Sequence, residues 1–316
     1  MHRFNRFNLD RIIGTYTTGL AGPLLIVIGG MHGNEPAGVL ALEQLFGLLE
    51  LESKKNPAFE FRGKLIGIRG NIAALKKNER FIKRDLNRSW IPSHLEQIKS
   101  QEASLDAEDK ELIELLNCLE PFIASSSDQI CVLDIHTTTA HGGIFSIPNG
   151  STKSLELAKA MHAPVVLGMI EGIRGTSLHY FNQANWGDKM TSVVFEAGQH
   201  DEPLAVDRSI SAIISCLREL GCIRSSDVES KHEAILKTYA KGLPTIAQLI
   251  YTHSISPDDQ FVMEPGFLNF QTIESGTVLA RDINGPIIAQ ESGVILMPLY
   301  QKQGEDGFFL VRPVEY

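Results

Sequence analysis

Residues 24–36 read Leu-Leu-Ile-Val-Ile-Gly-Gly-Met-His-Gly-Asn-Glu-Pro, and this stretch decides the fold. Its first five residues form an unbroken apolar run of strand length, which is typical of a buried strand in an α/β sheet. His32 and Glu35 follow in a glycine-rich turn, where the backbone bends freely. Ligands commonly bind at the carboxyl ends of strands in such sheets. The stretch therefore predicts a buried strand that ends in a binding loop.

His32 and Glu35 lie three residues apart, so that an imidazole and a carboxylate can reach one divalent metal ion. Zinc accepts this mixture of nitrogen and oxygen ligands. The alternative is an ordinary polar turn in which His32 caps a backbone group and Glu35 begins a helix. A single His-x-x-Glu does not decide between the two, so the motif needs partners from elsewhere in the chain.

The composition indicates a globular protein of ordinary kind. The chain has 316 residues, 43% of them hydrophobic and 21% charged, which is enough for one large domain and a small one. A formal net charge of -9 argues against nucleic acid or an anionic membrane as the main partner. The four cysteines form no C-x-x-C pair, so neither a disulfide framework nor a thiolate zinc site is indicated. No apolar run has membrane-spanning length, and residues 1–6 precede no signal-peptide core, so we expect a cytoplasmic protein.

Strands and helices alternate through most of the chain, and this alternation predicts an α/β sandwich. Residues 52–57 are charged and loop-like, whereas residues 78–90 are polar, rich in arginine and without clear periodicity. The predicted strands are 24–28, 63–71, 130–136, 165–168 and 192–196, and the predicted helices are 36–49, 105–122 and 210–220.

The pattern changes near residues 225–231, which form a polar and charged connection. From Ala234 onward the segments are short, alternating and interrupted by Gly and Pro, which is typical of a small β domain. We therefore expect an α/β domain over residues 1–225 and a β domain over residues 230–316 that narrows the cleft of the first. Tyr300 either reaches the site from this second domain or is an ordinary packing tyrosine.

Two further predicted strands end on polar residues that suit a metal site, His136 and Glu196. Two imidazoles and a carboxylate form a three-ligand zinc site with a fourth position open for water, which is the catalytic arrangement. Taken alone, a histidine at a strand end such as His136 more often has a structural role than a metal-binding one. Glu196 is harder to explain without chemistry, because glutamate is almost never fully buried unpaired, and a general base beside such a water has a reason to be there. Asp134 lies on the same side of its strand as His136 and either orients that imidazole or makes a salt bridge.

The arginine-rich stretch supplies groups that could bind substrate. Arginine forks bind carboxylates bidentately, and a guanidinium near a metal can stabilise an oxyanion. The alternative is a solvated basic loop. The candidates are Arg80, Arg84, Asp85, Asn87 and Arg88.

Four separated motifs occur in a familiar order. They are Gly-Gly-Met-His-Gly-Asn-Glu-Pro at 29–36, Arg-Asp-Leu-Asn-Arg at 84–88, Asp-Ile-His-Thr-Thr-Thr at 134–139 and Phe-Glu-Ala-Gly at 195–198. In this order they resemble the succinylglutamate desuccinylase/aspartoacylase family, which is related to the zinc carboxypeptidases. The resemblance implies a zinc-carboxypeptidase-like α/β/α sandwich with a mixed central sheet, followed by a small C-terminal β domain.

The resemblance also implies a mechanism. One Zn²⁺ per chain would be bound by His32, Glu35 and His136. Glu196 would be the general base and proton shuttle, and Arg80 would polarise the scissile carbonyl group.

For the substrate, the resemblance implies that Asn87 and Arg88 hold the free α-carboxylate of the amino-acid product. Aspartoacylases follow a Ser-Leu-x-Tyr stretch with an arginine that reads the substrate's side-chain carboxylate. Here the tyrosine of that stretch is Tyr180, but residues 181–185 contain no arginine. Tyr180 stays a candidate substrate contact, and Arg174 could replace the arginine only from another direction. We therefore expect a substrate side chain that need not be acidic.

Three functions compete at this point. The first is a zinc amidohydrolase that removes the acyl group from an N-acyl amino acid, a small-molecule substrate. The second is a metallocarboxypeptidase acting on short peptides, which would share the metal and carboxylate residues and differ in the room left by the C-terminal domain. The third is a non-catalytic metal-binding or sensory relative, which would need neither Glu196 nor Arg80. Assembly into a homo-oligomer is left open by the sequence.

Overall fold

The computed structural model describes residues 9–100, 104–228 and 231–315. The strands are β1 (Ile12–Tyr16), β2 (Leu20–Gly29), β3 (Arg62–Arg69), β4 (Ile130–Thr138), β5 (Phe145–Pro148), β6 (Val165–Leu167), β7 (Met190–Gln199), β8 (Ile246–Ser254), β9 (Val262–Met263), β10 (Gln271–Ile273), β11 (Val278–Asp282), β12 (Gly285–Ile288), β13 (Gly293–Leu296) and β14 (Asp306–Pro313). The helices are α1 (Ala37–Lys55), α2 (Ile72–Lys77), α3 (Pro92–Lys99), α4 (Ala107–Ser125), α5 (Thr152–Ala160), α6 (Met169–Gly172), α7 (Ser177–Tyr180), α8 (Gln183–Trp186), α9 (Leu204–Glu219) and α10 (Lys231–Tyr239), with short 3₁₀ turns at Leu86–Arg88 and Pro257–Asp259.

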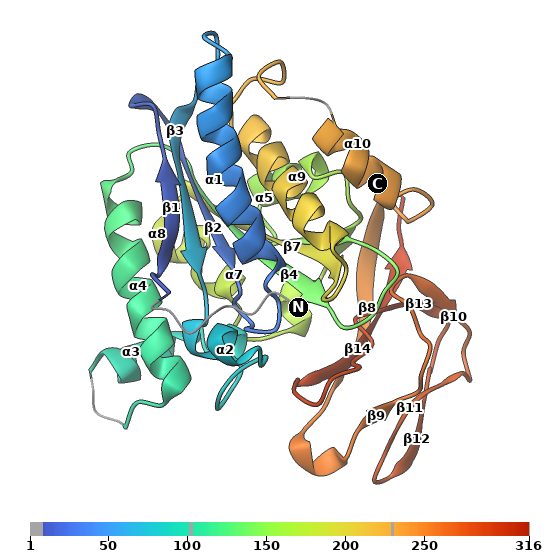
Figure 1. Cartoon of the computed structure of the whole chain (residues 1–316). Coiled ribbons are helices and arrows are strands. Elements are labelled where there is room, and N and C mark those ends of the chain that lie inside the picture. Colours follow the sequence, from blue (N-terminus) through green and yellow to red (C-terminus); the bar gives the residue numbers. More distant parts are fainter. Residues whose placement is uncertain (1–8, 101–103, 229–230, 316) are drawn as a thin grey trace.

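An 11-stranded mixed sheet runs through the molecule in the order β1-β3-β2-β4-β7-β5-β6-β8-β14-β13-β10 (Figure 1). Strands β3, β2, β4 and β7 are parallel to one another, whereas β1 and β5 pair antiparallel to their neighbours β3 and β7. A second, three-stranded antiparallel sheet contains β12, β11 and β9. The α/β fold with a mixed central sheet, predicted from the sequence, is confirmed.

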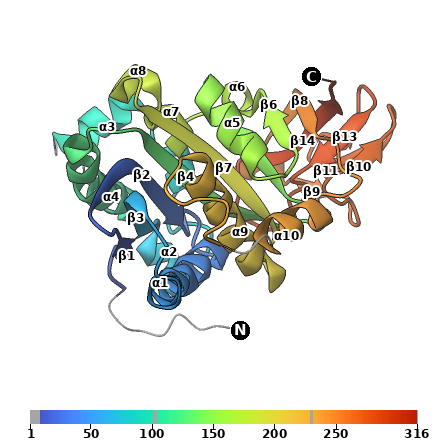
Figure 2. The ribbon, with the colours of Figure 1, turned by 90° about the horizontal axis from the view of Figure 1, so that it is seen from above.

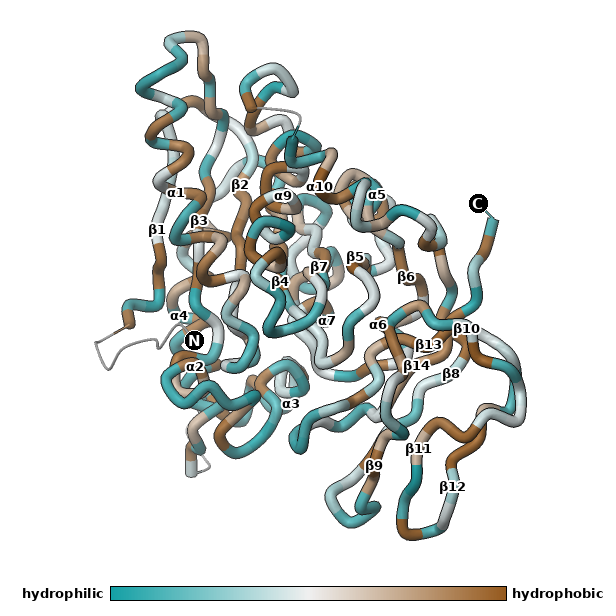
Figure 3. The backbone as a smooth tube through the Cα atoms, turned by 45° about the vertical axis from the view of Figure 1, so that its right-hand side comes forward, coloured by the Kyte–Doolittle hydropathy of each residue, from teal (hydrophilic) through white to brown (hydrophobic). Residues whose placement is uncertain are grey.

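Strand β2 is buried on both faces, as its apolar run predicts. Leu25 and Val27 pack into a core with α1 and α9, whereas Ile26 and Ile28 pack into a second core with α4. Seen from above in Figure 2, α1, α9 and α10 cover one side of the sheet and α4 lies on the other. The tube in Figure 3 is largely brown along β2 and β6, consistent with strands between two layers. Among the described residues, no helix is both long and apolar enough to cross a membrane.

Two local predictions were wrong. Helix α1 continues to Lys55, so the first part of the expected loop at residues 52–57 is helical. Its last turn carries Lys54 and Lys55, whose charges favour the C-terminal end of a helix. Likewise, β structure does not begin near Ala234, because α10 extends over Lys231–Tyr239.

The C-terminal part continues the central sheet. Strand β8 pairs in parallel with β6, with Ile246 opposite Val165, and β14, β13 and β10 follow it. The C-terminal strands form the right-hand end of the molecule in Figure 2. The division into domains at residues 1–225 and 230–316 stays a prediction, and residues 229–230 at its boundary lie outside the described ranges.

Candidate functional site

Three neighbouring strands carry the candidate site to one edge of the sheet. Glu196 in β7 lies directly opposite His136 in β4, and Gly29 at the end of β2 lies opposite Ile135. The strands are parallel, so their carboxyl ends meet at this edge. The loop after β2, which holds His32, therefore reaches the same place as His136 and Glu196.

Close packing around the loop requires its glycines. A Cβ added to Gly29 would lie 2.5 Å from the carbonyl carbon of Gly38 in α1. A Cβ added to Gly33 would lie 2.1 Å from the carbonyl carbon of Ala74 in α2. The loop is thus held between two helices, at a distance that only glycine permits. This packing fixes the backbone on both sides of His32.

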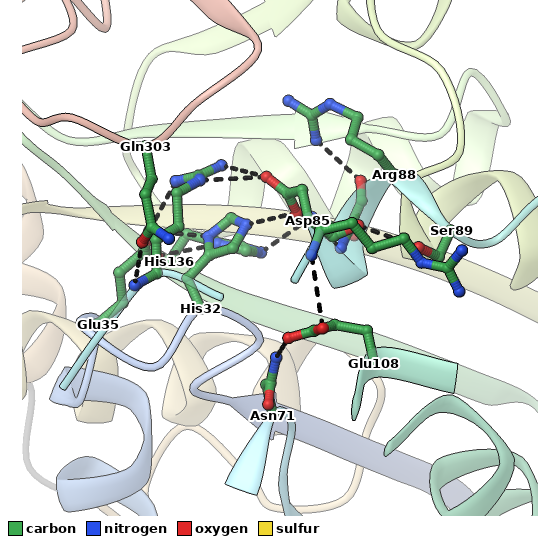
Figure 4. Close-up of polar contacts among 12 residues, drawn as sticks. His32, Glu35, Asn71, Asp85, Arg88, Ser89, Glu108, His136 and Gln303 are labelled. Carbon is green, nitrogen blue, oxygen red and sulfur yellow. Dashed lines mark hydrogen bonds and ion pairs between the residues drawn. The ribbon is translucent and has the colours of Figure 1, made fainter. Parts of the chain in front are cut away.

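The side chains of His32, Glu35 and His136 converge and are buried (Figure 4). Nδ1 of His32 lies 2.8 Å from Oε1 of Glu35, and Nδ1 of His136 lies 3.0 Å from Oε2 of the same carboxylate. One ligand atom from each of the three residues lies within 4.8 Å of the other two. The structure therefore brings together the three residues that the sequence analysis assigned to metal.

Each imidazole has a second carboxylate on its far side. Nε2 of His32 lies 3.1 Å from Oδ1 of Asp85, and Nε2 of His136 lies 3.2 Å from Oδ2 of Asp134. When a ring is neutral and donates its Nε2–H to the aspartate, its Nδ1 lone pair points towards an oxygen of Glu35. Facing lone pairs require a cation between them, and two imidazoles with one carboxylate are ligands that zinc accepts. The donor set thus fits a zinc ion.

The charges of this cluster shift its pKa values strongly. Burial alone would raise the pKa of Glu35, but the adjacent His32 and His136 hold it well below the ordinary value. Burial alone would lower the pKa of His136, but Asp134 and Glu35 raise it well above the ordinary value. In the metal-free protein these carboxylates favour the protonated form of His136, and a metal ion at its Nδ1 would replace the proton there.

Glu196 lies beside this cluster and lines the same cavity. Burial raises the pKa of its carboxyl group to about 8. Its Oε2 atom is buried and accepts no hydrogen bond from the residues described. An unpartnered carboxyl oxygen that faces a cavity is free to exchange a proton with a bound molecule.

Arg80 lines the cavity and is held by two acidic groups. Its Nε and Nη2 atoms donate to Oδ2 of Asp85 at 3.1 and 2.8 Å, and Nη1 lies 3.5 Å from Oε1 of Glu35. Asp85 therefore binds His32 through one oxygen and Arg80 through the other. This orienting role of Asp85 could not be predicted from the sequence, where Asp85 stands among the arginines, because the contact with His32 spans 53 residues.

Asn87 and Arg88 also line the cavity. Oδ1 of Asn87 accepts a hydrogen bond from the backbone N–H of Ser177 at 2.9 Å, which fixes the amide. Arg88 donates from Nη1 to the carbonyl oxygen of Asn87 at 2.8 Å and from Nη2 to Oδ2 of Asp306 at 2.5 Å. Burial opposes the charge of Arg88, but Asp85 and Asp306 raise its pKa, so the guanidinium stays protonated.

Tyr180 does not lie at the cavity. Its hydroxyl donates to Oε1 of Glu120 at 3.2 Å, and its ring packs against Trp90 and Phe181 on the α4 side of the sheet. These contacts give no support to the expected role in substrate binding. The ring fills part of the second core instead.

Three other candidates lie elsewhere as well. Arg84 forms an ion pair with Asp109 at the start of α4, and Arg174 is exposed and does not line the cavity. Tyr300 is 39% exposed, and its hydroxyl donates to the carbonyl oxygen of Glu264 at 3.1 Å. Tyr300 therefore packs within the C-terminal part, the second of the two alternatives given for it.

Residues 297–306 border the cavity on the C-terminal side. Gln301 accepts a hydrogen bond from Asn34 at 2.7 Å, and Gln303 accepts one from the backbone N–H of Arg80 at 3.1 Å. The carbonyl oxygen of Pro298 accepts a hydrogen bond from Thr139 at 2.9 Å. This segment is thus tied to the loops that carry the site.

His200, which was not predicted as a site residue, also lines the cavity. Its Nδ1 lies 2.7 Å from the hydroxyl oxygen of Thr137, whose backbone N–H donates to Oε2 of Glu35 at 3.0 Å. Nε2 of His200 is buried and has no hydrogen-bond partner in the described part of the chain. Its position four residues after Glu196 was the available signal.

Comparisons with known proteins agree with this geometry. The model of the succinylglutamate desuccinylase/aspartoacylase catalytic domain matches residues 21–208. A probable aspartoacylase of Synechococcus sp. (strain CC9605) is 29% identical over 212 residues, which cover 63% of this chain and 62% of that protein. An N-acyl-aromatic-L-amino acid amidohydrolase (carboxylate-forming) of Xenopus tropicalis is 32% identical over 144 residues, which cover 45% of this chain and 43% of that protein. These matches span less than two thirds of the length of either curated relative.

The similarity in fold extends over a longer part of the chain than the similarity in sequence. The crystal structure of a succinylglutamate desuccinylase from Chromobacterium violaceum has a TM-score of 0.61 with this chain at 17% identity, covering 94% of this chain and 86% of that one. The similarity includes the C-terminal part and, at this identity, concerns the fold alone. Because the family model covers more than half of the chain, the protein belongs to the succinylglutamate desuccinylase/aspartoacylase family.

Proposed function

We propose that the protein is a zinc-dependent amidohydrolase that cleaves the amide bond of an N-acyl amino acid. One observation carries the proposal: both histidines turn Nδ1 towards Glu35 while their Nε2 atoms bind Asp85 and Asp134. Imidazoles fixed in this way are prepared to bind a metal. The names of the curated relatives support an N-acyl amino acid as the substrate.

His32, Glu35 and His136 would hold one zinc ion per chain. Bound zinc would lower the pKa of water to about 7 and polarise a carbonyl oxygen as a Lewis acid. Asp85 and Asp134 keep both rings in the required tautomer. They also hold the rings against rotation, because each Nε2–H is fixed by a buried carboxylate.

Glu196 would act as the general base and then as the general acid. As a base it takes a proton from the attacking water, and as an acid it gives that proton to the departing amine nitrogen. Burial raises the pKa of Glu196 in the metal-free protein, and the positive charge of a bound zinc ion would lower it again, so that the carboxylate form would be available as the base.

Arg80 would stabilise the negative charge that develops on the carbonyl oxygen. Asp85 fixes the guanidinium in place, so little reorganisation accompanies the reaction. Asn87 and Arg88 would bind the α-carboxylate of the substrate. Arg88 uses Nη1 and Nη2 in the contacts described, and a guanidinium has five N–H donors, so donors remain for a carboxylate.

Two alternatives use the same residues. A metallocarboxypeptidase would need room for a peptide, and the segment at 297–306 borders the cavity and reduces that room. A non-catalytic metal-binding relative would have no use for Glu196 and Arg80, both of which line the cavity.

The zinc-loaded protein, assayed with a panel of N-acyl amino acids and dipeptides, tests the proposal. We expect hydrolysis of N-acyl amino acids with kcat/KM well above that for dipeptides. Metal analysis of His32→Ala and His136→Ala should show loss of zinc. Faster cleavage of dipeptides would favour the carboxypeptidase, and zinc-loaded protein without any hydrolysis would favour the non-catalytic relative.

A further inference from the structure

One wall of the cavity is formed by the hydrophobic core. We call the part of the cavity beside this wall the apolar chamber. Its lining residues are Ile147, Met169, Ile173, Leu178, Val194 and Phe309. All six belong to or pack against one core cluster between β5, α6, α7, β7 and β14. This wall of the cavity is therefore part of a hydrophobic core.

The apolar chamber adjoins the candidate zinc site. Val194 and Glu196 lie two residues apart in β7, so their side chains point to the same face of the sheet. The same cavity is lined by His32, Glu35 and His136. A group attached to the scissile amide is thus within reach of the chamber.

Both guanidinium groups that line the cavity are held by carboxylates, and the proposed function assigns their remaining donors to the scissile carbonyl group and to the α-carboxylate. Arg80 binds Asp85 and Arg88 binds Asp306, while Glu305 adds a further negative charge to the lining. Arg174 is exposed and lies outside the lining. A carboxylate placed in the apolar chamber would lose its hydration without gaining a cation, which is strongly unfavourable.

We propose that the apolar chamber binds an uncharged aliphatic or aromatic group of the substrate and disfavours an acidic one. The group is either the acyl chain or the side chain of the amino acid. This inference rests on the proposed deacylase function. It names the substrate class as N-acyl amino acids that are apolar at one end.

Two substrate series tell the acyl chain from the side chain. The first varies the acyl group on alanine through acetyl, butanoyl, hexanoyl and succinyl. The second keeps the acetyl group and varies the amino acid through alanine, leucine, phenylalanine and aspartate. In one of the two series kcat/KM should rise roughly 4-fold per added methylene until the chamber is full, because each CH₂ group becomes buried. The acidic member of that series should have the lowest kcat/KM. A series led by its acidic member, or no rise in either series, would overturn the inference.

A variant in the chamber wall sharpens the test. Ile173 is partly exposed, so Ile173→Arg can place a cation at the chamber without a fully buried charge. This variant should shift the ratio of kcat/KM for the acidic over the apolar member by about 10-fold or more, since one well-placed ion pair or polar contact gives discrimination of this order. Arg174→Ala, one residue further and exposed, is the matched control and should leave the ratio unchanged. An unchanged ratio in Ile173→Arg would contradict the binding of the substrate's apolar group in the chamber.

Binding separates a failure of the inference from a failure of the proposed function. Calorimetry with zinc-loaded protein should show tighter binding of hexanoate than of succinate if the chamber holds the acyl chain, or of leucine than of aspartate if it holds the side chain, whether or not any substrate is hydrolysed. Loss of all hydrolysis with this preference retained would contradict the deacylase function alone. Tighter binding of the acidic ligand in both pairs, or no binding of either hexanoate or leucine, would contradict the apolar chamber.

Discussion

At the scale of single residues, the site is defined by carboxylates that each contact two side chains through their two oxygens. Asp85 binds an imidazole through one oxygen and a guanidinium through the other, and Glu35 faces two imidazoles. The histidines could be predicted from the sequence because they follow apolar strands. Asp85 and His200 could not be assigned roles, because their contacts join segments that only the fold brings together.

The orienting role of Asp134 gives the first prediction. Asp134→Asn keeps the shape of the side chain but weakens the hydrogen bond that fixes Nε2 of His136. We expect zinc affinity to fall about 10- to 100-fold, as for other groups that orient metal ligands. Titration with a zinc chelator measures the effect. Asp128→Asn, an exposed carboxyl group at the other end of the same strand, is the control and should bind zinc as the wild type does.

The raised pKa of Glu196 predicts a pH-dependent stability of the metal-free protein. Burial raises this pKa from 4.5 in the unfolded chain to about 8, so the folded state holds a proton that the unfolded state has lost. The resulting stability is fully present below pH 4.5 and is lost as the pH rises through about 8.

Partly buried histidines with lowered pKa values, such as His179 and His200, titrate in the opposite sense, so the comparison needs a matched variant. Relative to Glu196→Gln, the wild type should lose up to roughly 1.4 kcal/mol of unfolding free energy per pH unit between pH 5 and 8. Urea titrations of both proteins without metal measure the difference. A difference in unfolding free energy that stays constant over this pH range would show that the pKa of Glu196 is not raised.

At the scale of elements, close approach of helices to the loop after β2 shapes the site. The strands and long helices could be predicted from their apolar periodicity, which is a local property. The contact between Gly33 and α2 could not, because a glycine in a turn also fits a loop without neighbours.

Two glycine substitutions test this contact. Gly33→Ala would place a methyl group against the backbone of Ala74, and we expect a loss of about 1–3 kcal/mol in unfolding free energy together with weaker zinc binding. Gly47→Ala is the control, because Gly47 lies in α1 with open space around it. This second substitution should stabilise the protein by about 0.5–1 kcal/mol. Equal effects of the two would contradict the close packing at Gly33.

At the scale of the whole molecule, the C-terminal part extends the central sheet and borders the cavity. The change of composition near residue 225 predicted additional β structure. It could not predict that β8 pairs with β6, because strand pairing between distant segments leaves no local pattern. Nor did it indicate the ion pair between Arg88 and Asp306, which joins the two parts of the chain across 218 residues.

The position of residues 297–306 predicts a size limit for substrates. Hydrogen bonds to Asn34 and Arg80 hold this segment against the site loops, so the cavity should exclude long chains. We expect peptides of about six residues or more to be cleaved far more slowly than N-acyl amino acids, as measured by amino-acid release. Efficient cleavage of such peptides by the intact protein would refute the limit.

The central claim is that Glu196 moves protons beside a zinc ion and is not itself a ligand. Glu196→Gln, prepared with zinc and assayed with the best N-acyl amino acid, tests it most directly. Zinc content and melting temperature should match the wild type in zinc-loaded protein, while kcat should fall about 10²- to 10⁴-fold, the usual contribution of a positioned acid–base group. Turnover near the wild-type rate, or loss of zinc from the variant, would contradict the account.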